Sequence, residues 1–470
     1  MIFNNPELLL HSPWWEEGFS IDADVKLRRL TAMKFVYCHP LLDEYPFSQD
    51  AILVLRGPRQ IGKSTLIKQI ISKLLTNRIP GKSILYLPCD RIVDFNKLYS
   101  IILEYIQTRR IDESGRLYLF IDEIPYVPQW QRAIKSLADT GLLDGTTVLV
   151  TGSNAIDLKF SSERLPGRTG SYYRFEKQFL PLTFKEFYKL VNPQWDGSYK
   201  PSQVYLYKKY FHDYLITGGF PAVINEYYTE WFISPSTYET YINWIEGDIH
   251  KLGRSVEIMY GIVKSIDRLA GSRASYTQIA KETGVASQQT VQEYLEILRD
   301  LFITFECPYL SLEQKRSNYK KNRKFYFTDP FIHNALIVKE RGFMDNGHMY
   351  VVKKLLQEKH MDYRLEETVG CNMYKKFDKM YYGDFSGGKE IDFAGIKAGE
   401  TKLFEVKNSK EIDLSRYKSI PAEYDNITII SQGIEQVKGR FHIKHALKFF
   451  LQVDKHCSLN QTQQYLRKHS

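Results

Sequence analysis

One segment constrains the fold of this chain more than any other: residues 57–65 read Gly-Pro-Arg-Gln-Ile-Gly-Lys-Ser-Thr. An apolar run, Ala51–Leu55, precedes it, and apolar residues at helical spacing follow it over Thr65–Leu75. The pattern G-x-x-x-x-G-K-[ST] between a strand and a helix is that of a phosphate-binding loop (P-loop). The alternative is a Gly-rich turn beside a helix, but chance matches to four fixed positions are rare.

Three further apolar runs extend this pattern along the first half of the chain. They are Ser83–Leu87, Leu117–Ile121 and Thr147–Thr151, and segments with helical periodicity, such as Gln129–Leu137, lie between them. Strands that alternate with helices are typical of a parallel sheet. The first half is therefore predicted to be an α/β domain with a parallel sheet.

The chemistry of the loop follows from its residue types. Glycines allow the backbone to wrap an anion, so that successive N–H groups and the positive end of the next helix face it. Lys63 is predicted to reach the β- and γ-phosphates, and Ser64 to supply a hydroxyl ligand to Mg²⁺. The residues predicted to bind ATP and magnesium are Gly57, Pro58, Arg59, Gln60, Ile61, Gly62, Lys63, Ser64 and Thr65.

Two acids follow the third predicted strand, at Asp122 and Glu123. Ligands of open α/β sheets lie at the carboxyl ends of the strands. Asp122 is predicted to hold magnesium through its water shell, and Glu123 to polarise the attacking water as a general base. A P-loop alone predicts binding, whereas a P-loop with this acid pair predicts hydrolysis.

The fourth predicted strand ends at Gly152, followed by Ser153 and Asn154. A polar side chain at this place can contact the γ-phosphate or the attacking water. The alternative is a turn or helix-cap role for Ser153 or Asn154, and the sequence favours neither interpretation over the other.

Residues 20–190 resemble the AAA-type ATPases of a large prokaryotic group of ATP-binding proteins, related to the extended AAA+ and STAND-like ATPases. The matching segments are LRGPRQIGKST, FIDEIPYVPQWQRAIKSLADTG, VLVTGSNA, LPGR and FLPLTFKEF. The resemblance implies magnesium and water roles for Asp122 and Glu123, and a sensor role for Ser153 or Asn154. It also implies an arginine finger at Arg168, for which the alternative is a surface arginine.

The resemblance continues at YLITGGFPAVINEY, which is similar to the segment that follows this ATPase in its two-part architecture. It implies a helical region, a winged-helix-like unit and a C-terminal domain resembling the PD-(D/E)xK nucleases, with a restriction-endonuclease-like α/β fold. The predicted boundaries are 1–190 for the ATPase domain, 191–255 for a helical lid or linker, 256–312 for the winged-helix-like domain, 325–455 for the nuclease-like domain and 456–470 for a flexible tail.

The segment 275–298 reads as helix, turn, helix, with Gly284 at the turn and Ser287 capping the second helix. In a DNA reader, Gln288, Gln289 and Gln292 would enter the major groove. The alternative is a helical packing module or a protein contact.

A basic stretch follows this segment and is predicted to be a loop or linker. It contains Lys315, Arg316, Lys320, Lys321, Arg323 and Lys324 around Tyr319.

Acids and a lysine recur on predicted strands near the end of the chain. Strand alternation places Glu390 with Asp392 on one face, and Glu405 with Lys407 on one face. Two carboxylates from adjacent strands can share a divalent cation, Mg²⁺ or Mn²⁺, and a lysine can orient water or steady phosphate charge. The resemblance adds Glu366 as a helix acid, although Glu367 beside it leaves that choice open. The alternative is an amphipathic sheet with a salt-bridged face.

Composition adds expectations about the environment of the chain. Five scattered cysteines, including Cys457, have no metal-ligand spacing, which favours a reducing cytoplasm. No apolar run approaches the roughly 20 residues of a membrane span, and the start has no basic n-region. The formal charge of +9 is compatible with a polyanion partner or with a solvated basic surface.

Two functional hypotheses follow. The first is an Mg²⁺-dependent AAA+ ATPase whose ATP cycle drives or regulates a DNA-binding, metal-dependent nuclease half. The alternative is an ATP-dependent molecular switch or protein-interaction module with a catalytically inert nuclease-like domain. An arginine finger would imply a homo-oligomer, but the sequence leaves the oligomeric state open.

Overall fold

The computed structural model describes residues 6–45, 48–112, 115–152, 173–357, 360–386, 389–433 and 435–452. The chain divides into two compact units, Met1–Leu180 (unit 1) and Pro181–Ser470 (unit 2).

Unit 1 is built on a five-stranded sheet in the order β2-β3-β4-β1-β5, in which every neighbouring pair is parallel. The central strands are mostly apolar and are buried along their whole length, as expected for a sheet covered on both faces. The predicted parallel sheet and its four strands are confirmed. The bounds are β1 Ala51–Arg56, β2 Ile84–Pro88, β3 Leu117–Asp122, β4 Thr146–Gly152 and β5 Tyr173–Gln178.

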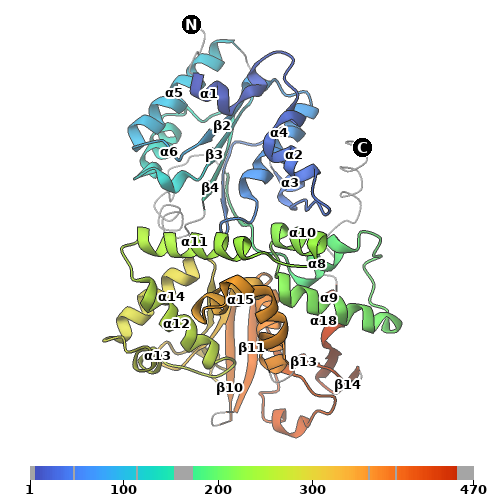
Figure 1. Cartoon of the computed structure of the whole chain (residues 1–470). Coiled ribbons are helices and arrows are strands. Elements are labelled where there is room, and N and C mark those ends of the chain that lie inside the picture. Colours follow the sequence, from blue (N-terminus) through green and yellow to red (C-terminus); the bar gives the residue numbers. More distant parts are fainter. Residues whose placement is uncertain are drawn as a thin grey trace. The chain divides into compact units, whose positions relative to one another are not determined.

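Helices cover both faces of this sheet (Figure 1). In the view of Figure 1, α5 and α6 lie on one side of the strands, and α2, α3 and α4 lie on the other. Both predicted helices are present, as α4 and α6. The bounds are α1 Pro6–His11, α2 Val25–Thr31, α3 Leu41–Glu44, α4 Lys63–Thr76, α5 Phe95–Asp112 and α6 Trp130–Asp139.

Unit 2 begins with four helices, α8 Phe184–Val191, α9 Val204–Thr217, α10 Pro221–Glu230 and α11 Pro235–Lys251. The predicted Gly-Gly turn separates α9 from α10. Gly218 has a φ of 57°, and a Cβ there would lie 2.0 Å from Asp329 Oδ1. The next N–H, that of Gly219, donates to Asp329 Oδ2 at 2.8 Å. Glycine is required here because the chain turns directly against a buried carboxylate.

Three helices and a strand pair follow, namely α12 Val256–Arg268, α13 Tyr276–Thr283, α14 Gln288–Asp300, and antiparallel β6 Thr304–Cys307 with β9 Lys324–Phe327. Gly284 has a φ of 70° at the predicted turn, and Ser287 Oγ accepts from Thr290 N as the predicted cap. The strand predicted over 301–305 begins later, at Thr304, because Phe302 adopts a left-handed φ of 59°.

The basic stretch predicted as a loop or linker is partly a strand segment, which corrects that prediction. A short antiparallel hairpin, β7 Tyr309–Ser311 with β8 Arg316–Ser317, occupies its first part. Its last residue, Lys324, opens β9. The cations of this stretch differ in burial, because Arg323 and Lys324 are buried whereas Lys315, Arg316, Lys320 and Lys321 are exposed.

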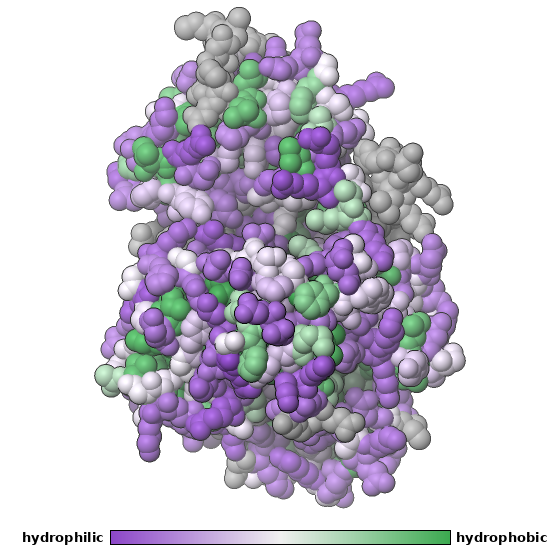
Figure 2. Space-filling view, viewed as in Figure 1, coloured by the Kyte–Doolittle hydropathy of each residue, from purple (hydrophilic) through white to green (hydrophobic). Residues whose placement is uncertain are grey.

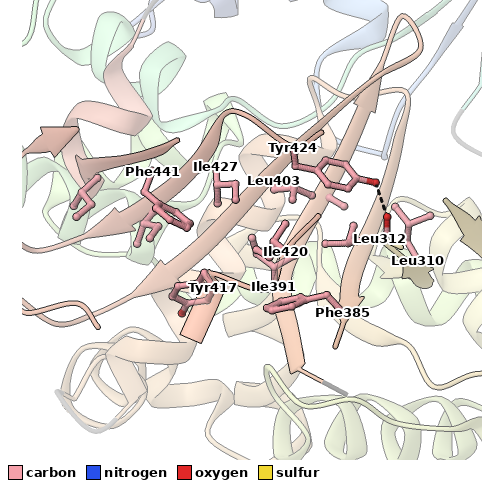
Figure 3. Packing of buried hydrophobic residues seen from close by; sticks show 13 residues of the cluster. Leu310, Leu312, Phe385, Ile391, Leu403, Tyr417, Ile420, Tyr424, Ile427 and Phe441 are labelled. Atoms are coloured by element: carbon pink, nitrogen blue, oxygen red, sulfur yellow. Dashed lines mark hydrogen bonds between the residues drawn. The ribbon is translucent and has the colours of Figure 1, made fainter. Parts of the chain in front are cut away.

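The second sheet of unit 2 has eight strands in the order β14-β15-β13-β12-β11-β10-β7-β8. Its apolar face packs around a core that includes Leu312, Ile391, Leu403 and Ile427, and Tyr424 closes it by donating to Leu312 O (Figure 3). The bounds are β10 Lys379–Phe385, β11 Lys389–Lys397, β12 Glu400–Lys407, β13 Ile427–Ser431, β14 Gln436–Lys438, β15 Phe441–His445, α15 Pro330–Glu340, α16 Gly347–Tyr350, α17 Met361–Tyr374 and α18 Ala446–Leu451.

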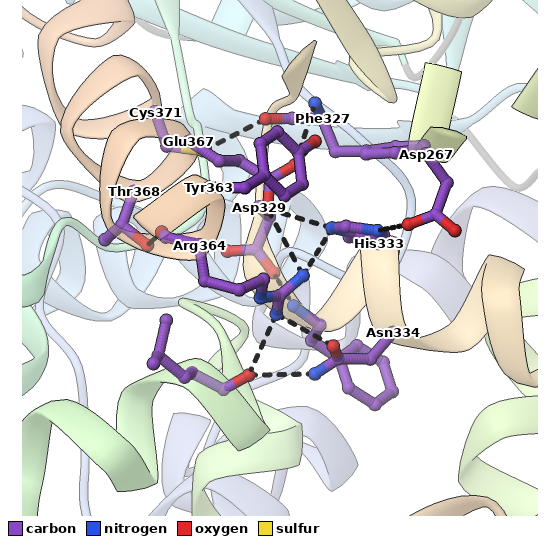
Figure 4. A network of polar contacts seen from close by, with 12 residues as sticks. Asp267, Phe327, Asp329, His333, Asn334, Tyr363, Arg364, Glu367, Thr368 and Cys371 are labelled. Atoms are coloured by element: carbon purple, nitrogen blue, oxygen red, sulfur yellow. Dashed lines mark hydrogen bonds and ion pairs between the residues drawn. The ribbon is translucent and has the colours of Figure 1, made fainter. Parts of the chain in front are cut away.

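A buried ionic network joins three helices of unit 2 (Figure 4). His333 on α15 lies 2.8 Å from Glu367 on α17 and 3.1 Å from Asp267 on α12. Arg364 contacts His333, lies 3.2 Å from Glu367 and donates to Asn334 Oδ1. Both His333 and Arg364 thus contact the Glu367 carboxylate within this structural network. Its neighbour Glu366 takes no part in the network.

Hydrophilic residues cover most of the face drawn in Figure 2, and hydrophobic residues form small separate patches. Within the described part of the chain, no helix is both long and apolar enough to cross a membrane.

Candidate functional site

The P-loop turns tightly between β1 and α4. Gln60 and Gly62 adopt left-handed φ values of 61° and 109°, which turn successive N–H groups inward in the manner of an anion-binding nest. A Cβ on Gly57 would lie 2.2 Å from the carbonyl oxygen of Phe179, so only glycine fits there. The backbone required for a phosphate cradle is therefore formed by the local sequence.

Lys63 occupies the centre of this loop. Its ammonium donates to the carbonyl oxygens of Gly57 and Pro58, each at 3.0 Å, and lies 3.5 Å from Glu123 Oε1. Burial lowers the pKa of Lys63, while Glu123 and Asp122 oppose that shift. The ammonium is thus held between the loop and the acid pair, and an incoming phosphate would compete for it.

Asp122 is fixed at the tip of β3 by two hydroxyls. Tyr86 on β2 donates to Oδ2 at 2.8 Å, and Thr151 on β4 donates to Oδ1 at 2.6 Å. Burial and the negative charge of Asp122 raise the pKa of Tyr86, so Tyr86 stays a donor. Sequence analysis did not single out Tyr86 or Thr151; the signal was a polar residue near the end of each strand that flanks β3.

Glu123 has an unusual backbone. Its φ of 53° is left-handed, a conformation that costs a non-glycine residue on the order of 1 kcal/mol or more. Its N–H donates to Thr151 Oγ1 at 3.0 Å, which holds that conformation. Strain of this kind concentrates at functional sites, and here it directs the carboxylate toward Lys63.

We expect Thr151→Val to lower ATP turnover by about 10- to 100-fold, because both Asp122 and Glu123 lose the hydroxyl that positions them. The free energy of unfolding should fall by about 1–3 kcal/mol, since a buried acceptor and a donor lose their partner. Thr151→Ser keeps the hydroxyl and is the control. Steady-state ATPase and urea unfolding of both variants measure the effect, and equal behaviour of the two would contradict this assignment.

A cavity of about 540 Å³ adjoins the acid pair, and a volume in this range is typical of small-molecule sites. Asp122, Glu123 and Asp24 contribute acids to its lining, and Lys68 lies 3.3 Å from Asp24 and 3.9 Å from the ring centre of Tyr86. Room therefore exists directly beside the carboxylates predicted to act on water.

Of the other site residues predicted in unit 1, some lie in the described part of the chain and some do not. Ser64 is in the first turn of α4, next to Lys63. Arg59 donates from its guanidinium to the Tyr126 hydroxyl at 3.3 Å. Ser153, Asn154 and Arg168 lie outside the described residues.

A second cluster of charged residues lies in unit 2, between helix α17 and strands of the large sheet. Glu366 on α17, Asp392 on β11 and Glu405 on β12 come together as the sequence predicted. Lys407 lies 2.6 Å from Glu405 Oε1, which confirms that these two share a face. Sequence analysis missed the cation at the centre: Lys324 lies 2.9 Å from Asp392, 3.1 Å from Glu366 and 3.4 Å from Glu390.

The charges of this cluster are strongly coupled. Burial and then Asp392 raise the pKa of Glu366 to about 7, and the same two causes raise that of Glu405 to about 7. Burial alone would lower the pKa of Lys324, but Asp392, Glu366 and Glu390 outweigh burial and hold it above its usual value. Lys324 is therefore a permanently charged residue among carboxylates.

The predicted DNA-reading residues of α14 are exposed, but two of them are engaged with acids one turn further on. Gln289 donates to Glu293 at 3.3 Å, and Gln292 donates to Glu296 at 3.0 Å. Gln288 accepts from the Thr277 hydroxyl. In contrast, Tyr319 in the basic stretch is 71% exposed.

Two family models match the chain. One, described as an AAA domain, matches residues 49–188, and the other, described as a domain of unknown function, matches residues 208–341. The first match spans the P-loop, the acid pair and all five strands of the parallel sheet. Unit 1 therefore has a P-loop ATPase-like fold of the AAA type, and this fold implies nucleotide binding.

Similar proteins come from bacteria and archaea. An uncharacterized protein of Haemophilus influenzae is 26% identical over 402 residues, which cover 83% of this chain and 91% of that protein. An uncharacterized protein of Methanocaldococcus jannaschii is 23% identical over 381 residues, covering 70% of this chain and 80% of that protein.

The chain is also similar, at lower sequence identity, to two solved structures. A Walker-type ATPase of Pyrococcus abyssi has 14% identity and a TM-score of 0.42, covering 63% of this chain and 93% of that chain. The ORC2 protein of Aeropyrum pernix, solved in ADPNP-ADP complexes, has 12% identity and a TM-score of 0.40, covering 73% of this chain and 98% of that chain.

Proposed function

We propose that this protein is an Mg²⁺-dependent ATPase whose nucleotide cycle controls a DNA-binding second half. The observation that carries the ATPase proposal is the meeting of Lys63 with Glu123 at 3.5 Å, beside an Asp122 that two strand hydroxyls hold in place. Lys63 as the proposed phosphate-binding cation, Asp122 as the proposed magnesium ligand and Glu123 as the candidate general base thus lie at one edge of the sheet. Binding alone does not require Glu123, whereas hydrolysis does.

The residues at this edge fit a hard divalent cation, because the hydroxyl of Ser64 and the carboxylate of Asp122 are oxygen donors. Bound with ATP, magnesium would neutralise phosphate charge. Lys63 exchanges the carbonyls of Gly57 and Pro58 for phosphate oxygens. Glu123 accepts a proton from the attacking water. Ser153 or Asn154 is proposed to sense the γ-phosphate, and Arg168 to act as an arginine finger on a neighbouring copy.

The DNA part of the proposal rests on the hairpin and loop of residues 309–323, which we call the wing. Four exposed cations surround an exposed Tyr319, a combination suited to phosphate contact and base stacking. The α14 helix is less suited to DNA, because Glu293 and Glu296 lie beside its glutamines. We therefore place DNA contact on the wing rather than on α14.

A second candidate function is an ATP-dependent switch that binds a protein partner and holds an inert nuclease-like sheet. The observation that favours it is Lys324 among the carboxylates, since an ammonium already lies where a metal would be needed. Metal-dependent DNA cleavage stays a prediction from the sequence.

The DNA proposal is tested with a variant in which Lys315, Arg316, Lys320 and Lys321 are changed to Gln. We expect double-stranded, single-stranded or branched DNA to stimulate the ATPase of the unmodified protein and to stimulate this variant much less. The slope of log K against log salt should fall by up to about 3.6, because four phosphate contacts are lost.

The matched control changes four exposed lysines outside the wing, Lys208, Lys251, Lys353 and Lys354, to Gln. It loses the same formal charge and should keep both DNA stimulation and the salt slope. An ATPase that no DNA stimulates, or equal losses in the two variants, would reject DNA binding through the wing and favour the switch.

A further inference from the structure

The carboxylate cluster of unit 2 contains a cation that belongs to the protein itself, the ammonium of Lys324. The Lys324 ammonium is 1% exposed at the side chain and has three donors, which face Asp392, Glu366 and Glu390 at 2.9, 3.1 and 3.4 Å. One cation with three carboxylates is the charge arrangement of a metal site. Here the positive charge belongs to the polypeptide.

The backbone fixes Lys324 in this place. It is the first residue of β9, paired with Cys307 of β6. The preceding residue, Arg323, exchanges two backbone hydrogen bonds of 2.9 Å with Ala274. Tyr326, on the same face of β9 as Lys324, donates to Glu366 at 2.6 Å. The lysine is therefore placed by strand pairing on both sides and not by a freely moving loop.

Oxygens of Asp392 and Glu405 also accept hydrogen bonds from the protein. Asp392 Oδ2 accepts from Val406 N at 2.9 Å, and Glu405 Oε2 accepts from Asp392 N at 3.2 Å. Glu405 Oε1 accepts from the Tyr417 hydroxyl and pairs with Lys407. Arg273 lies 2.9 Å from the second oxygen of Glu390. Three cations thus face four carboxylates.

This arrangement does not fit a divalent cation. Mg²⁺ requires oxygen ligands at about 2.0–2.1 Å in a near-octahedral shell, whereas here one oxygen each of Asp392, Glu366 and Glu390 faces the Lys324 ammonium instead. Among the described residues, no group of three or more His, Cys, Asp or Glu side chains is arranged to hold a metal ion.

We propose that Lys324 is a resident cation that takes the place of a divalent metal ion in the nuclease-like sheet, so that this cluster is closed to metals in the native protein. The lysine offsets part of the negative charge of the carboxylates. It follows that removing the ammonium should open the cluster to a divalent cation.

The experiment titrates Mn²⁺ into full-length protein without nucleotide, by calorimetry and by thermal unfolding. The variants are Lys324→Met, which keeps the length of the side chain, and Lys321→Met, an exposed lysine three residues away. Any weak binding at the P-loop is common to all proteins and cancels. Lys324→Met should bind one more Mn²⁺ per chain and gain about 5 °C in melting temperature at saturating Mn²⁺. The unmodified protein and Lys321→Met should show neither effect.

Two outcomes overturn the proposal. One is a folded Lys324→Met protein that gains no Mn²⁺ site. The other is unmodified protein that binds Mn²⁺ at a site which Asp392→Asn removes, because the lysine would then exclude nothing. If Lys324→Met fails to fold, the comparison of unmodified protein with Asp392→Asn decides: no difference supports the resident cation, and loss of a site refutes it. ATPase activity enters none of these readouts, so failure here is distinct from failure of the ATPase proposal.

Discussion

Glu123→Gln is expected to bind ATP and to hydrolyse it about 10²- to 10⁴-fold more slowly than the unmodified protein, the range that general-base catalysis supplies. The amide keeps the size of the side chain but cannot accept a proton from water at neutral pH. The N–H of residue 123 still donates to Thr151, so the left-handed turn and the position of Asp122 are retained.

The same change removes the carboxylate that lies 3.5 Å from Lys63. Burial lowers the pKa of Lys63, and Glu123 opposes that shift. In the Glu123→Gln variant without nucleotide, the charged form of Lys63 is therefore less well stabilised. Phosphate then becomes the best remaining partner, and ATP affinity should be equal or higher. Fluorescent-nucleotide binding and single-turnover hydrolysis measure the two properties separately.

Glu104→Gln is the matched control, because Glu104 is an exposed glutamate on α5 in the same unit. It should bind and hydrolyse ATP like the unmodified protein. Normal hydrolysis by Glu123→Gln would show that another group activates water, and loss of ATP binding would show that Glu123 serves the architecture of the site.

Lys63→Ala is expected to lower ATP affinity by at least about 30-fold, since truncating one member of a buried charge pair costs roughly 2–5 kcal/mol. Turnover should fall further, because the transferred phosphoryl group loses its cation as charge develops. The fold should persist, since the lysine's hydrogen bonds in the loop go to the carbonyl oxygens of Gly57 and Pro58, which water can satisfy.

Calorimetric titration of ATP with magnesium and steady-state ATPase measure these effects. Lys97→Ala removes an exposed lysine from α5 in the same unit and should change neither quantity. ATP binding by Lys63→Ala with normal affinity would contradict the phosphate assignment. Unaltered circular dichroism and melting temperature of the variant exclude loss of structure as the cause.

The sequence predicted the parts of the structure that local pattern controls. The P-loop, the four predicted strands of the parallel sheet and the cap at Ser287 depend on residues close together in the chain. Strand alternation also predicted that Glu390 and Asp392 share a face, which their common contact with Lys324 confirms.

What the sequence did not predict depends on partners distant in the chain. Lys324 is 42 residues from Glu366 and 68 from Asp392, and it stands in a polar stretch that resembles a solvated loop. The Lys-Phe-Tyr-Phe pattern of β9 carried a signal, since alternation puts Lys324 and Tyr326 on one face. Tyr86 and Thr151 were missed for the same reason, because only sheet pairing brings them to Asp122.

The network of Figure 4 has a mechanical consequence for unit 2. Asp267, His333 and Glu367 come from three different helices, and Arg364 is enclosed with them. Sliding α15 past either neighbour would separate His333 from Asp267 or from the buried Glu367, which is costlier than moving the helices together. We therefore expect the three helices to move as one rigid body, so that a displacement of α12 would be transmitted through α15 to α17.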